Sequence, residues 1–76
     1  MTVIFILFNA KQPGQLKKIE EFHTYVSQGL KNDNIIIDIV AMMVSTNLSR
    51  EMQEQLTEIK EWAINNVVNY RAVSEN

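Results

Sequence analysis

The side chains that could perform acid–base chemistry are few and scattered in this sequence. His23 is the only imidazole, and it follows Phe22 at the edge of an apolar stripe without a partner carboxylate at motif spacing. A general base needs an orienting partner and a substrate cleft. The glutamates stand beside lysines on expected outward helix faces, which is typical of a solvated surface. We therefore expect no catalytic residue, favour a non-enzymatic role, and expect His23 to be dispensable.

Metal and cofactor binding also lack their usual residues. The chain has no cysteine and one histidine, which disfavours an all-protein metal site and excludes disulfides and thiolate-bound zinc. Only Gly14 stands where a phosphate-binding loop would need several glycines, and no dinucleotide fingerprint is present. We expect no cofactor and no metal.

Six polar residues form one candidate ligand-binding site. They follow two predicted strands, and the carboxyl ends of parallel strands meet helix N-termini at one edge of a sheet, where ligands usually bind. Free amides, hydroxyls and two cations at that edge suit an anion such as a phosphate group. Turns and helix caps require the same residue types, so ordinary capping is the competing interpretation. The six are Asn9, Lys11, Thr46, Asn47, Ser49 and Arg50.

Two apolar runs predict the strands that position this edge. Ile35 to Val44 is rich in β-branched residues and is broken only by Asp38, which favours a strand buried on both faces. Thr2 to Phe8 is apolar on both faces and is interpreted as a central strand. A helix beginning near Pro13 separates the two strands. Its buried stripe is Leu16, Ile19, Phe22, Val26 and Leu30.

The last third of the sequence allows two interpretations. A helix from about Ser49 to Tyr70 would place one apolar stripe on the sheet, with Asn47 or Ser49 as its cap. In the alternative, Asn65 and Asn66 form a turn and residues 67–73 form a third strand, because β-branched and aromatic residues dominate there. We favour the long helix.

The fold class is therefore α/β, a small two-layer β-α-β-α unit with parallel strands in a single domain, residues 1–76. A two-stranded sheet with two apolar faces is marginal by itself, so we expect oligomerisation to complete it, with a homodimer as the first choice. The formal charge of -2 disfavours nucleic acid and anionic membranes as partners. The first apolar run is too short for a signal peptide or a membrane span, which predicts a cytoplasmic protein.

Asp38 makes the two faces of its strand different. Ile35, Ile37, Ile39, Ala41 and Met43 form an uninterrupted apolar face that should lie beneath the helices. The other face carries Asp38, whose carboxylate needs water or a partner. We predict an interface formed by this second face and by apolar residues of the second helix that lie off its stripe: Ile36, Asp38, Val40, Met42, Trp62, Ile64 and Val68.

The strand–helix–strand order in so short a chain resembles the subunit of the small tautomerases, which assemble as oligomers and use an N-terminal proline as base. Thr2 follows Met1 here, so the resemblance extends to architecture and not to chemistry. The function we favour is a non-enzymatic protein-binding or regulatory module that acts through oligomerisation and a protein partner. The alternative is a small enzyme or a protein that binds an anionic or phosphate ligand at the carboxyl ends of the strands.

Overall fold

The computed structural model of the chain describes residues 2–29 and 35–74. Three strands alternate with two helices along the sequence. They are β1 (Thr2–Asn9), α1 (Gln15–Gly29), β2 (Ile35–Val44), α2 (Arg50–Asn65) and β3 (Asn69–Ser74). The strands form one parallel sheet in the order β1-β2-β3. The predicted α/β class with parallel strands is confirmed, and a third strand extends it.

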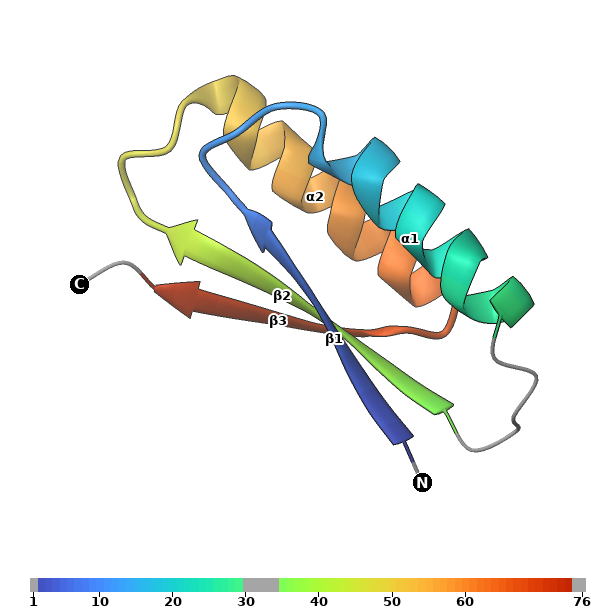
Figure 1. Cartoon of the computed structure of the whole chain (residues 1–76). Coiled ribbons are helices and arrows are strands. Elements are labelled where there is room, and N and C mark those ends of the chain that lie inside the picture. The colour runs from blue at the N-terminus through green and yellow to red at the C-terminus, as the bar shows by residue number, and fades with distance from the viewer. Residues whose placement is uncertain (1, 30–34, 75–76) are drawn as a thin grey trace.

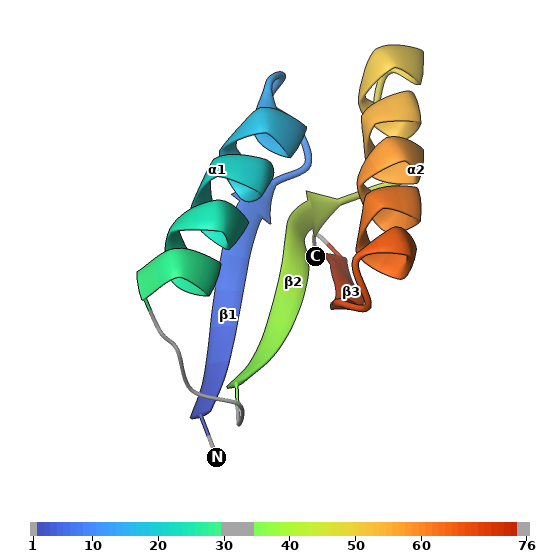
Figure 2. The ribbon, with the colours of Figure 1, turned by 90° about the vertical axis from the view of Figure 1, so that its right-hand side faces the viewer.

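Both helices cover the same face of the sheet (Figures 1 and 2). The two crossovers run in the same direction across the sheet, and parallel crossovers are right-handed, so each helix returns over the same side. No other described element covers the opposite side (Figure 1). The subunit therefore has two layers, and one face of its sheet is open.

The hydrophobic core lies between the sheet and the helices. Its buried cluster consists of Ile6, Phe8, Ile19, Ile39, Ala41, Ile59 and Ala63. Ile37 packs against this cluster, so the prediction that the uninterrupted face of β2 lies beneath the helices holds for Ile37, Ile39 and Ala41. It is wrong for Met43, which has a φ of 63° and is exposed at a register shift between β2 and β3. This bulge returns Val44 to the core side.

The favoured long helix to Tyr70 is wrong, and the alternative of a third strand is confirmed, although the turn lies at Asn66 and Val67 and β3 begins at Asn69. Asn66 caps α2, and the chain reverses through a Schellman motif. The amide of Val68 donates to the carbonyl of Ala63 at 2.8 Å, and the amide of Val67 donates to the carbonyl of Ile64 at 3.3 Å. These bonds satisfy carbonyls that a longer helix would have paired, which frees the following residues to form β3 beside β2.

The interpretation of residues 2–8 as a central strand is also wrong, because β1 lies at an edge and β2 is central. Two apolar faces on β1 do not mean that both are covered. Ile6 and Phe8 are buried beneath α1, whereas Phe5 and Leu7 on the opposite side are 55% and 65% exposed. One of the two apolar faces of β1 is therefore not covered by the described part of the subunit.

Candidate functional site

The uncovered side of the sheet, here called the open face, is left without a covering layer by the described residues. Strand alternation and register assign its members. They are Val3, Phe5 and Leu7 of β1, Ile36, Asp38, Val40 and Met42 of β2, and Asn69, Arg71 and Val73 of β3. Most of these side chains are apolar, and contiguous exposed apolar surface of this kind marks an interaction site in soluble proteins.

Asp38 lies at the centre of the open face. Its register partners are Phe5 on β1 and Asn69 on β3, and it is only 9% exposed. Every fully buried side-chain oxygen or nitrogen of the described residues has a hydrogen-bond partner, and none of these residues donates a hydrogen bond to the Asp38 carboxylate. The Asp38 oxygens therefore still reach water between their neighbours, as expected for a carboxylate that is not fully buried.

Arg71 lies on the same face, opposite Val40 and two residues beyond Asn69. Val40 is buried but does not belong to the core cluster beneath the helices, which agrees with its place on the open face. Arg71 is exposed and makes no ion pair with Asp38 in the described part of the chain. The open face thus carries one acid and one base, and neither has an ionic partner among residues 2–29 and 35–74.

The predicted interface residues separate into two groups. Ile36, Asp38, Val40 and Met42 lie together on the open face. Trp62 and Val68 pack against the subunit's own core, and Ile64 is 68% exposed on α2 in the helix layer. The argument that Val68 flanks a helix stripe is wrong because α2 ends at Asn65. The seven residues therefore do not form one surface.

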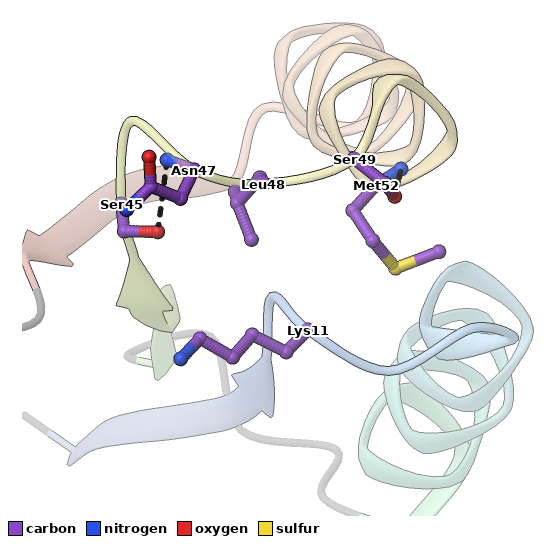
Figure 3. Close-up of a pocket in the computed structure, with 6 residues that line it drawn as sticks. All are labelled: Lys11, Ser45, Asn47, Leu48, Ser49 and Met52. Atoms are coloured by element: carbon purple, nitrogen blue, oxygen red, sulfur yellow. Dashed lines mark hydrogen bonds between the residues drawn. The ribbon is translucent and has the colours of Figure 1, made fainter.

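A pocket of 310 Å³ opens at the carboxyl edge of the sheet (Figure 3). Lys11 enters it from the β1–α1 loop, and the β2–α2 loop and the start of α2 supply the remaining lining. The lining residues are Lys11, Ser45, Asn47, Leu48, Ser49 and Met52. Three of the six predicted ligand-binding residues, Lys11, Asn47 and Ser49, are thus brought together. Asn9, Thr46 and Arg50 do not line the pocket.

Several of these polar groups serve as caps and turn contacts. The Ser49 hydroxyl accepts a hydrogen bond from the Met52 amide at 3.2 Å and caps α2. The Ser45 hydroxyl accepts from the Asn47 amide at 3.3 Å, which is visible in Figure 3. Outside the pocket, the Asn9 side chain accepts from the Lys11 amide at 2.9 Å, and Arg50 pairs with Glu54 at 3.4 Å on the surface. The capping interpretation therefore accounts for Asn9, Ser45 and Ser49, whereas Arg50 forms a surface ion pair.

Three glutamines that the sequence did not single out hold the two loops of this edge. The side chain of buried Gln15 accepts a hydrogen bond from the backbone amide of Asn9 at 3.3 Å and donates one to the backbone carbonyl of Pro13 at 3.2 Å. The side chain of Gln55 in α2 accepts a hydrogen bond from the backbone amide of Gln15 at 3.0 Å and donates one to the backbone carbonyl of Gln12 at 2.8 Å. Gln53 donates to the Leu48 carbonyl at 2.9 Å. A glutamine near a helix start carries no sequence signal for such contacts. The two contacts of Gln55 join residues that are 40 and 43 positions apart, which only the fold brings together.

His23 contacts Trp62 edge-on, with ring centroids 5.1 Å apart and an interplanar angle of 90°. It therefore joins α1 to α2, as a packing contact between the helices.

On the core side of β3, burial raises the pKa of the Tyr70 phenol above its ordinary value of 10.0. Tyr70 packs against the core cluster, and the shift reflects the cost of charging a phenol there.

Within residues 2–29 and 35–74 no cluster of three potential metal ligands occurs, and no helix there is both long and apolar enough to cross a membrane. Comparison with protein-family models, curated proteins and solved structures finds no match for this chain. Its function must therefore be argued from its own surfaces.

Proposed function

We propose that this protein is a small non-enzymatic interaction module that acts by covering the open face of its sheet with another polypeptide. The single observation that carries the proposal is the exposure of apolar residues on that face. Phe5 and Leu7 are more than half exposed, and Val3 and Val73 are 44% and 40% exposed. An association that removes them from water gains about 25 cal/mol for each Å² of apolar surface buried.

The architecture supports this proposal independently of the residue types. Parallel sheets in soluble proteins usually have both faces covered, whereas here the only two helices of the described chain lie on one side. The open face has no lysine and no glutamate, the residues that most often keep an exposed sheet in solution. A polypeptide layer on that side would complete the fold.

The proposal assigns no catalysis to the pocket at the carboxyl edge. Its serine hydroxyls already accept hydrogen bonds from backbone amides of their own loop and helix. The pocket is lined by the β1–α1 loop, the β2–α2 loop and the start of α2 (Figure 3), and none of its lining residues belongs to the open face. Binding of a small anion there, through Lys11 and the start of α2, is the competing function that the experiment below separates.

Site-specific photo-crosslinking in the cells that produce the protein tests the proposal. Benzoylphenylalanine is placed at position 7 on the open face, or at position 64 on α2 as a matched control. Leu7 and Ile64 are similar in size and are 65% and 68% exposed, so only their location differs. We expect discrete covalent adducts from position 7 and none from position 64.

Absence of adducts from position 7, or equal adducts from both positions, would refute the proposal. The anion-binding function would then be supported if inorganic phosphate raises the melting temperature of the purified protein and Lys11→Ala abolishes the increase. The same measurement on Leu7→Lys provides the control, because a change on the open face should leave phosphate binding intact.

A further inference from the structure

We propose that the polypeptide covering the open face is a second copy of this chain, arranged so that Asp38 of each copy meets Arg71 of the other. This inference rests on the proposed function, since it names the partner of the same face. Its support comes from the charges on that face and from the amount of surface the subunit leaves exposed.

The charges restrict what can cover the face. Asp38 is central, 9% exposed and without an ionic partner in the described chain. A covering layer would take its remaining water away, and an unpaired buried charge costs several kcal/mol. The covering surface must therefore present a cation near Asp38 and an anion near Arg71, in addition to apolar side chains.

A second copy satisfies all three requirements with one symmetry operation. Asp38 lies on β2, and Arg71 lies on the neighbouring strand two residues beyond the register partner of Asp38, which places their Cα atoms about 8 Å apart. Consider a two-fold axis that lies between two facing sheets and passes midway between these two residues. It places Asp38 of each copy opposite Arg71 of the other copy. Both ion pairs then form at once, which is the self-complementarity that a two-fold interface requires.

The exposed area also fits a dimer of ordinary size. The subunit exposes 5470 Å², whereas about 4,800 Å² is expected for a folded monomer of its mass, 8.8 kDa. The excess of roughly 700 Å² is close to the area of about 800 Å² that each partner contributes to a standard interface. The exposed apolar side chains of the open face, with Phe5 55% and Leu7 65% exposed, would contribute to the area buried in such an interface.

Charge-reversal complementation in the purified full chain tests this geometry. Wild-type protein at about 10 µM should sediment as a dimer, while Arg71→Glu and Asp38→Lys should each weaken dimerisation at least about thirty-fold, because like charges would face each other. An equimolar mixture of the two variants should recover dimers, since only the mixed pair places opposite charges at both contacts. Glu58→Lys and Lys60→Glu, on the exposed side of α2, are matched controls that should not change sedimentation.

Circular dichroism of each variant separates unfolding from dissociation. Arg71 and Leu7 are exposed, so Arg71→Glu and Leu7→Glu provide the test if Asp38→Lys does not fold; both should give folded monomers. A monomeric wild type, or dimers that survive Arg71→Glu, would overturn the inference. If the wild type is monomeric yet position 7 crosslinks to a different protein in cells, only this inference fails; if position 7 gives no adduct, the proposed function fails as well.

Discussion

Replacing Val67 by asparagine should stabilise the subunit, although it removes an apolar side chain. Val67 is the C′ residue of the Schellman motif that ends α2, with a φ of 54°. A left-handed conformation places Cβ too close to the neighbouring carbonyl, and it is least tolerated by β-branched residues. Glycine or asparagine normally occupies this position.

The expected magnitude follows from the environment of the side chain. Val67 is 95% exposed, so its removal costs almost no packing, while relief of the left-handed strain is worth about 1–2 kcal/mol. Val67→Asn should therefore raise the free energy of unfolding by about 1 kcal/mol, or the melting temperature by about 4–8 °C for a domain of this size. Val67→Gly should also stabilise the subunit, because glycine adopts the left-handed conformation without a Cβ penalty and commonly occupies this position.

Thermal and urea denaturation at one fixed protein concentration measure the effect, since the proposed dimerisation would make stability concentration-dependent. Ile64→Asn is the matched control. Ile64 is also exposed but has regular helical geometry three residues earlier. Asparagine and isoleucine have similar helix propensities, so Ile64→Asn should leave the stability nearly unchanged or slightly lower. An unchanged or lower stability of Val67→Asn would refute the strain argument and, with it, the assignment of this chain reversal.

Two further predictions concern single side chains of the subunit. Gln15→Met should lower the free energy of unfolding by about 1–3 kcal/mol, since the Asn9 amide and the Pro13 carbonyl lose their partner; urea denaturation measures this against Gln28→Met, an exposed control on the same helix, and equal effects would contradict it. Burial raises the pKa of Tyr70 above 10.0 in the folded state, so the stability that its neutral phenol provides is complete below pH 10 and is lost as the pH rises above that value towards the raised pKa. Tyr70→Phe should remove this part of the alkaline destabilisation, and a pH series that falls equally in both proteins would exclude the effect.

The sequence by itself determined the parallel β-α-β beginning of the fold and the division of β2 into two faces. Both follow from local patterns: a dense β-branched run predicts a strand, and a period of two separates Asp38 from Ile37 and Ile39. The sequence also predicted that Lys11, Asn47 and Ser49 lie at one edge of the sheet, because parallel strands bring their carboxyl ends together.

Only the tertiary structure decided where α2 ends. Residues 64–70 contain enough apolar side chains for either a helix or a strand, and an apolar run alone does not separate the two. Long-range strand pairing decides between helix and strand here. Tyr70 and Arg71 are the register partners of Ile39 and Val40 on the central strand. That pairing outweighs the strain of a valine in the left-handed turn, which no local propensity would predict.

The open face was likewise decided by topology. Two apolar faces on β1 indicated a central, covered strand, but burial depends on how many layers the chain can supply, and both right-handed crossovers return over the same side. The residues that make β1 look central are therefore the ones left exposed. Hydrophobic patterning determined which side chains must leave water, and the arrangement of strands and helices decided which of them the subunit could bury alone.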